Sequence, residues 1–96
     1  MSSSSPSVAA RIESKLRDAL SPSKLDVIDE SHLHAGHAGA RPEGETHFRI
    51  LVVADAFVGM TRVARQRRVN AILADELAGP VHALAMKTQT PAEAAS

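Results

Sequence analysis

The sequence predicts a single α/β domain of the α+β type, in which the elements follow the order helix, strand, strand, helix, strand. Two segments carry apolar residues at helical spacing, and three shorter segments show the apolar patterns of strands. Only two of the 96 residues are aromatic, so the core of this small chain has to be built from Val, Ile, Leu, Ala and Met. Aliphatic residues of this kind suit helices packed on a thin sheet.

A first helix is predicted over residues 8–20. Its apolar side chains recur every four positions as one narrow stripe, formed by Ile12, Leu16 and Leu20. Ser7 is a suitable N-cap, and Ser21-Pro22 ends the helix. The Ser- and Pro-rich residues 1–7 in front of it are expected to form a disordered tail.

Two strands are predicted in the first half of the chain. Leu25 and Val27 alternate with polar residues, which is typical of a half-buried strand. The continuous apolar run within Thr46–Ala54 indicates a strand at the centre of the sheet. Between them Gly, Ala and Pro are frequent in His34–Glu45, which predicts a long exposed loop. The two strands are consecutive, and we expect them to pair antiparallel.

A second long helix is expected after a turn at Phe57–Gly59, with Thr61 as its cap and its end near Leu77. Gly79-Pro80 stops this helix and leads into a third strand over Val81–Lys87. A helical crossover between the last two strands should be right-handed and should make them parallel.

Residues 8–90 are expected to form the domain, and residues 91–96 a polar C-terminal tail, in which Pro91 can begin one helical turn. Eleven basic and eleven acidic residues cancel, so no global field draws the chain to nucleic acid or to an anionic membrane. The longest apolar run, Ile50–Ala54, is too short to span a bilayer, and the N-terminus lacks the pattern of a secretory signal. We therefore expect a cytoplasmic bacterial protein.

The chain contains no cysteine, which excludes disulfides, zinc–thiolate sites and cysteine nucleophiles. It also cannot hold an iron–sulfur cluster alone in the usual way, because that chemistry normally uses four thiolates. The dinucleotide-binding, phosphate-loop and zinc-protease motifs are all absent from the sequence. No serine or carboxylate pair stands in a catalytic context, so we expect that the protein is not an enzyme.

The five histidines are candidate metal ligands. Three of them, His32, His34 and His37, lie within six residues at the edge of the predicted loop. They can offer imidazole to a transition metal, or they can belong to a solvated polar loop. His82 is the only polar residue in Pro80–Met86, so it is either a core-edge side chain or a ligand held on a rigid strand. His47 opens the central strand and can belong to either class.

Four arginines stand near the start of the second helix: Arg62, Arg65, Arg67 and Arg68. Residues three apart share a helix face, so these side chains can form a stripe that contacts phosphates. The alternative is a solvated face whose charge is balanced by Asp75 and Glu76 farther along the helix. Basic residues at a helix N-terminus interact unfavourably with the helix dipole, so their presence there suggests a function such as contact with phosphates.

Three blocks together resemble the BolA family. ETHFRILVV (Glu45–Val53) is similar to the second strand of that family, and FVGMTRVARQRRVNAILADEL (Phe57–Leu77) is similar to its Arg-x-Arg helix. The most specific block is GPVHALAMKTQTP (Gly79–Pro91), and DESHLH (Asp29–His34) resembles the block before the variable loop. Gln66 departs from the pattern, because many members have His between the two arginines. With the first helix, the resemblance covers about eighty residues.

The resemblance implies a fold like a class II KH domain, with a three-stranded mixed sheet and helices packed on one face. It also implies a partnership with monothiol glutaredoxins, in which the two proteins share a [2Fe–2S] cluster. The family histidines would be His82 and His34, with His37 as an alternative to His34. Two imidazoles on one iron and thiolates on the other make sound ligation, and a chain without cysteine would take its thiolates from the glutaredoxin and a bound glutathione.

Some bacterial members of that family are also described as DNA-binding transcriptional regulators of morphology and stress genes. The sequence thus supports two functions that need not exclude each other, an iron–sulfur adaptor and a DNA-binding regulator. The first would depend on the histidines, and the second on the arginines.

Overall fold

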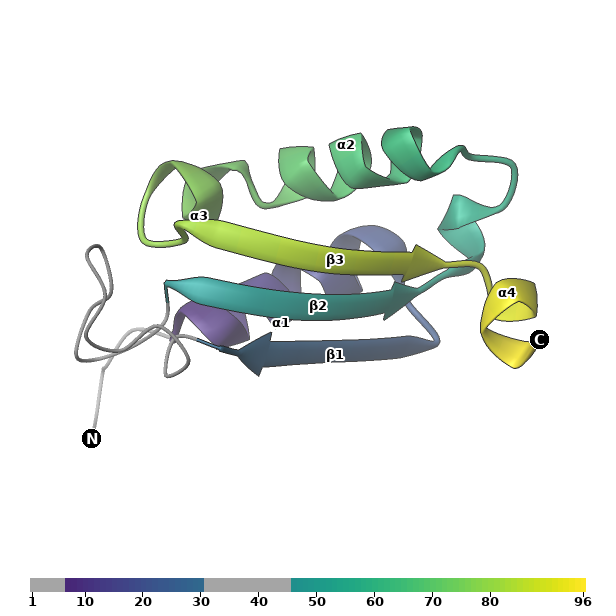
Figure 1. Cartoon of the computed structure of the whole chain (residues 1–96), viewed down its shortest axis with the longest axis horizontal. Helices are drawn as coiled ribbons and strands as arrows, with labels where there is room; N and C mark the ends of the chain where they lie inside the picture. The colour runs from purple at the N-terminus through teal and green to yellow at the C-terminus, as the bar shows by residue number, and fades with distance from the viewer. Residues whose placement is uncertain (1–6, 31–45) are drawn as a thin grey trace.

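The computed structural model describes residues 7–30 and 46–96 (Figure 1). Within these ranges three strands form one mixed sheet in the order β1-β2-β3. Strand β1 (Lys24–Asp29) pairs antiparallel with β2 (His47–Val53), and β3 (Ala83–Gln89) pairs parallel with β2. The predicted α+β class and the predicted pairing of the strands are confirmed.

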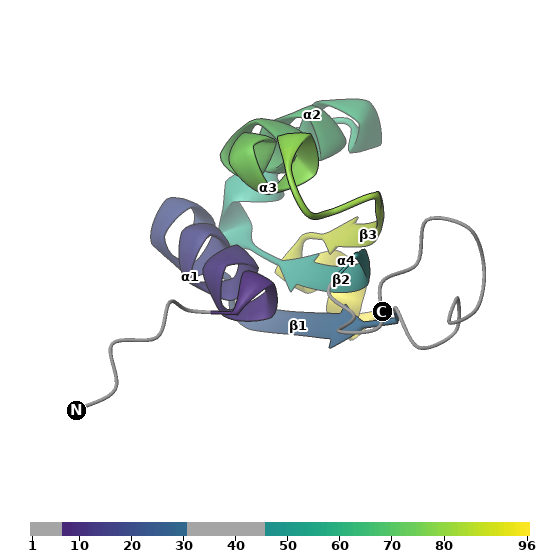
Figure 2. The same ribbon diagram turned by 90° about the vertical axis from the view of Figure 1, so that its left-hand side faces the viewer.

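The helices lie on one side of this sheet. Figure 2 shows α1 (Val8–Leu20) beside β1 and β2, with α2 (Arg62–Ile72) and α3 (Ala74–Ala78) farther along the same side, above β3. The first two helices begin at the predicted caps, because the hydroxyls of Ser7 and Thr61 each accept a hydrogen bond from the amide three residues later. None of the helices in the described ranges is long and apolar enough to cross a membrane.

The core is a single layer between the helices and the sheet. Strand β2 forms the sheet side of this core, since alternate residues of the strand are buried against the helices: Phe48, Ile50 and Val52. Facing them are the predicted stripe of α1 and the buried side chains of Phe57, Val69 and Leu73. The side chains of Ala54 and Val81 complete the same cluster. Aliphatic residues thus supply most of the core, as the composition predicts.

The second helix is not continuous, which corrects the expected helix to Leu77. It ends at Ile72, and the backbone of Leu73 (φ −100°, ψ 20°) redirects the chain into α3. This change of direction points Glu76 at α1, where its buried carboxylate accepts a hydrogen bond from Lys15 Nζ at 2.9 Å. The guanidinium of Arg11 lies 3.4 Å from the same carboxylate. The acidic residues of α3 therefore pair with α1 and do not balance the arginines of α2.

Two boundaries near the C-terminus also differ from those expected. Strand β3 begins at Ala83, because the amides of His82 and Ala83 both donate to the Thr46 carbonyl at the start of the ladder. Residues 91–96, expected as a tail with room for one helical turn, contain the short helix α4 (Pro91–Ala95). Thr90 and Glu93 form a capping box at its start, and Pro91 occupies its first turn.

Replacing Glu76 tests the pairing of α3 with α1. We expect Glu76→Ala to lower the free energy of unfolding by about 2 kcal/mol, because it leaves Lys15 and the partly buried Arg11 without their common acceptor. Alanine favours helix, so this loss would not come from helix propensity. Urea unfolding followed by circular dichroism measures it. Asp75→Ala is the matched control, since the Asp75 side chain is 92% exposed and the change should stay within about 0.5 kcal/mol.

Candidate functional site

His82 lies at the start of strand β3, on the surface of the molecule. The residue precedes Ala83, the first residue of the strand, and its backbone amide donates to the Thr46 carbonyl at 2.7 Å. Its side chain is exposed. His82 is therefore not a core-edge histidine, and its imidazole stands on a backbone that the sheet holds in place.

The His47 ring lies beside that of His82. The two ring centroids are 6.3 Å apart and the ring planes are inclined by 29°. The parallel register places His47 opposite Ala83, so β2 and β3 both begin at this end of the sheet. Sequence reasoning left His47 undecided, and the signal that could have placed it is the expected parallel pairing of the two strands, which brings their first residues together.

A buried hydroxyl orients the His47 ring. The side chain of Thr46 is fully buried, and its Oγ1 lies 2.8 Å from His47 Nδ1. A hydrogen bond at one ring nitrogen fixes the orientation of an imidazole and directs the other nitrogen, which is how the outer neighbours of metal-ligating histidines act. We call His47 and His82 the imidazole pair.

The segment that contains the other three histidines starts and ends beside this pair. His32, His34 and His37 lie outside the described residues, so their roles as ligands stay predictions. The residues that flank the segment are Glu30 and Thr46, and the amide of Glu30 donates to the His47 carbonyl at 2.8 Å. Both flanking residues are thus joined to the start of β2, next to the imidazole pair.

The imidazole pair can offer nitrogen ligands but cannot complete a metal centre alone. Within residues 7–30 and 46–96 no three side chains of His, Cys, Asp or Glu are grouped so as to hold a metal ion. The whole chain has no cysteine. The donors fit a metal group that takes imidazole from this protein and its remaining ligands from elsewhere.

The four arginines do not form one stripe. Arg65 is 5% exposed, and its guanidinium donates to the carbonyls of Met60 and Thr88 and to both carboxylate oxygens of Glu93. It also lies over the Phe57 ring, 5.8 Å from the centroid. Its positive charge thus ties α2 to β3 and α4, and it is not available to an outside phosphate.

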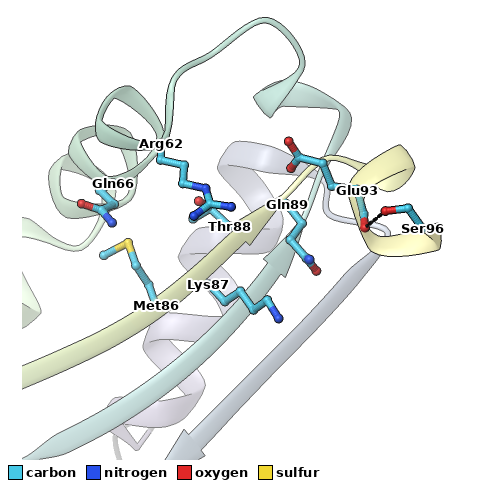
Figure 3. Close-up of a pocket in the computed structure, with 8 residues that line it drawn as sticks. All are labelled: Arg62, Gln66, Met86, Lys87, Thr88, Gln89, Glu93 and Ser96. Carbon is cyan, nitrogen blue, oxygen red and sulfur yellow. Dashed lines mark hydrogen bonds between the residues drawn. The ribbon is translucent and has the colours of Figure 1, made fainter.

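The other three arginines of α2 are exposed: Arg62, Arg67 and Arg68. Arg62 borders a hollow of about 380 Å³ between α2, the C-terminal half of β3 and α4 (Figure 3). Its walls include polar side chains from all three elements, among them Gln66, Lys87, Gln89 and Glu93. This hollow lies at the opposite end of β3 from the imidazole pair.

Comparison with known proteins places this geometry in a family. The sequence matches the description "BolA-like protein" over residues 16–93. The chain belongs to the BolA family. It is 50% identical over 86 residues to human BolA-like protein 1, which covers 90% of this chain and 60% of that protein. The chain thus spans less than two thirds of the length of this relative.

Two further BolA proteins extend the comparison. A Vibrio cholerae protein named "DNA-binding transcriptional regulator BolA" is 48% identical over 82 residues, covering 85% of this chain and 74% of that protein. The solved BolA domain of SufE1 from Arabidopsis thaliana superposes with a TM-score of 0.81 at 43% identity, covering 94% of this chain and 99% of that domain. The arrangement of sheet and helices described above is therefore the BolA fold.

Acid titration tests the contact that keeps Arg65 inside this BolA domain. The pKa of Glu93 is lowered from its ordinary value of 4.5 to about 2, chiefly by the hydrogen bond from Arg65 and then by the backbone amide of Thr90. A carboxylate with a lower pKa in the folded state stabilises the fold above its unfolded pKa, and this contribution disappears as the pH falls from 4.5 towards 2. Glu93→Gln should therefore lose less stability than the wild type across this window.

The measurement is the midpoint of urea unfolding at several pH values on both sides of the window, with direct titration of the Glu93 carboxyl carbon by NMR. Glu13→Gln is the control, because Glu13 pairs with the Arg17 side chain, which is 53% exposed, whereas the Arg65 side chain that pairs with Glu93 is 7% exposed. Equal pH dependence of the wild type and Glu93→Gln would show that the contact with Arg65 contributes nothing in solution.

Proposed function

We propose that this BolA protein is a non-enzymatic iron–sulfur adaptor, which binds a monothiol glutaredoxin and supplies imidazole ligands to a bridging [2Fe–2S] cluster. The observation that carries the proposal is the exposed imidazole of His82 at the start of β3, held by the sheet beside a second imidazole. A ligand on a strand has a fixed position before the partner arrives, which reduces the cost of assembling the site.

The donor chemistry fits a shared cluster. Imidazole ligands on one iron of a [2Fe–2S] group, with thiolates on the other, give a higher reduction potential than an all-thiolate set. Because this chain has no cysteine, every thiolate would come from the glutaredoxin cysteine and a bound glutathione. When bound, the cluster would supply electron-transfer or cluster-transfer chemistry. This chain would hold the cluster through its imidazole ligands and would bind the glutaredoxin.

His82 is the first proposed ligand, and His34 the second, with His37 able to replace it. This assignment follows the family pattern, and it is compatible with the described part of the chain, since both ends of the 31–45 segment adjoin His47. His47 borders the same site, with a ring that Thr46 orients. We therefore include His47 among the residues that shape the environment of the cluster.

Co-expression with a monothiol glutaredoxin tests this function. We expect a coloured heterodimer with the visible absorption of a [2Fe–2S] cluster, and a colourless protein when the chain is purified alone. His82→Ala should abolish the heterodimer spectrum and keep the circular dichroism of the fold, because the exposed ring contributes little to the core. His47→Ala should shift the spectrum and retain the colour, since that ring borders the site.

Lys24→Ala is the matched control for these variants, because Lys24 is exposed at the opposite end of the sheet. It should leave both the complex and its spectrum unchanged. A colourless mixture of unassociated proteins would remove the adaptor function. A coloured heterodimer whose spectrum is the same in wild type and His82→Ala would remove His82 from the ligand set.

A second candidate function, DNA binding, rests on the three exposed arginines of α2. Arg62, Arg67 and Arg68 concentrate positive charge on one helix of a chain with no net charge. The name of the Vibrio cholerae relative supports this alternative. If the three guanidinium groups each contact a phosphate, the logarithm of the binding constant should fall with the logarithm of salt concentration with a slope of about −3.

The double variant Arg67→Ala/Arg68→Ala tests this surface. It should flatten the salt slope to about −1, because two phosphate contacts disappear. The measurement is fluorescence anisotropy of a labelled duplex at several salt concentrations. Arg17→Ala serves as the control, since it removes an exposed arginine from α1. An unchanged slope in the double variant would show that α2 is not the DNA-contacting surface.

A further inference from the structure

The outer edge of strand β3 has backbone groups that no strand pairs with in the described part of the chain. In a β-ladder, alternate residues of a strand bond to the neighbour on each side. Ala83 donates to Thr46 and Gln89 accepts from Ala54, so the odd-numbered residues of β3 bond to β2. The backbone groups of Leu84, Met86 and Thr88 therefore point away from the sheet.

One contact already shows that this edge accepts hydrogen bonds. The Thr88 carbonyl, at the C-terminal end of the edge, accepts from Arg65 Nη1 at 3.2 Å. This hydrogen bond satisfies the carbonyl of Thr88, the last one that points outward from β3. The amides of Leu84, Met86 and Thr88 remain directed outward. A guanidinium in this place marks where an added strand would have to end.

Space for an added segment lies along the same edge. The 380 Å³ hollow is lined by Met86, Lys87, Thr88 and Gln89 of β3, and by Arg62 and Gln66 of α2. Figure 1 shows α2 beyond the edge of β3, and Figure 2 shows it on the same side of the sheet as α1. An extended segment paired with β3 would thus continue the sheet into the space between β3 and α2 (Figure 1).

The charge of the hollow defines its occupant. Figure 3 shows Arg62 reaching from α2 towards Thr88, while Lys87 extends from β3 away from that helix. The carboxylate of Glu93 is already engaged by Arg65, at 2.7 and 3.2 Å. The two exposed cations that line the hollow, Arg62 and Lys87, therefore exceed the available negative charge.

We propose that the outer edge of β3 is a docking site for an extended acidic peptide segment, which adds a fourth strand to the sheet. Main-chain hydrogen bonds to Leu84, Met86 and Thr88 would supply affinity, and carboxylates facing Arg62 and Lys87 would supply selectivity. This site is separate from the imidazole pair, and it does not depend on the proposed cluster. An exposed strand edge invites pairing with another chain, and here the cations restrict which chain can pair.

The test uses the full chain labelled with ¹⁵N and a capped peptide of alternating threonine and aspartate. We expect slowed hydrogen exchange at the amides of Leu84, Met86 and Thr88, with no change at Ala85 and Lys87, which already bond to β2. The alternation is the decisive result, because only strand addition protects every second amide. The same peptide with a central proline should not protect them, since proline cannot donate to a ladder.

Charge selectivity is tested with variants of the protein and the peptide. Arg62→Ala/Lys87→Ala should weaken peptide binding roughly 2- to 30-fold, the range expected from two exposed ionic contacts. Arg67→Ala, the matched control on the same helix, removes a cation that does not line the hollow and should leave the affinity unchanged. A peptide with lysine in place of aspartate should bind more weakly than the acidic one.

Four outcomes would overturn the proposal. The first is that the peptide does not bind at millimolar concentration, and the second is that NMR signals shift around the arginines without protection of alternate amides. The third is that the same amides become protected without peptide as the protein concentration rises. The fourth is that single-stranded DNA binds more tightly than the peptide and protects no amides. The third would assign the edge to a second copy of this chain, and the fourth would assign the hollow to nucleic acid. Loss of the glutaredoxin cluster with intact peptide binding would concern the imidazole pair alone.

Discussion

The parallel pairing of β2 with β3 is the interaction on which the rest of the structure depends. Strand β2 is central, so its alternate residues form the floor of the core and its backbone serves two neighbours. The register that sets His47 opposite Ala83 brings two imidazoles, 35 positions apart in the sequence, to one end of the sheet. The same pairing makes β3 an edge strand, whose second row of backbone groups faces outward.

Arg65 shows how this small domain secures that edge strand. Leu84 and Met86 of β3 pack against the core only partly buried, and α4 has no buried residue. A buried guanidinium with four hydrogen bonds connects the start of α2, the Thr88 carbonyl and the Glu93 carboxylate. Charge-assisted hydrogen bonds of this kind are stronger than neutral ones. The Glu93 carboxylate also accepts from the Thr90 amide in the capping box of α4. Arg65 therefore holds the C-terminal end of β3 and the start of α4 together.

Local sequence signals predicted the elements that have local causes. Helix α1 has its predicted bounds because a capping serine, a four-residue apolar interval and a Ser-Pro stop all lie within the segment. The capping box of α4 is also present in the sequence, as Thr90 followed three residues later by Glu93, and together with Pro91 it indicates the helical turn that the structure contains. The fold class followed from the order of these segments and from the handedness of the crossover.

Contacts between distant residues decided what the sequence did not predict. The apolar spacing of the second helix continues through Leu73, and the break there brings Glu76 against Lys15 of α1, 61 positions away in the sequence. An arginine is exposed by default, so Arg65 could not be assigned to the interior without its partner Glu93, 28 positions along the chain. His47 was placed beside His82 only by the register of two strands.

The two ends of β3 thus offer different chemistry to a partner. The N-terminal end presents imidazoles whose usefulness depends on thiolates from another molecule, because the chain has none of its own. The C-terminal end presents main-chain donors between two cations, which suit an acidic strand. A partner that engaged the strand edge would be aligned with the axis of β3, and its position along that axis would be fixed by the hydrogen-bond register. If a single partner engaged both surfaces, edge pairing would restrict its rotation at the imidazole end, because the second contact would then form within one complex.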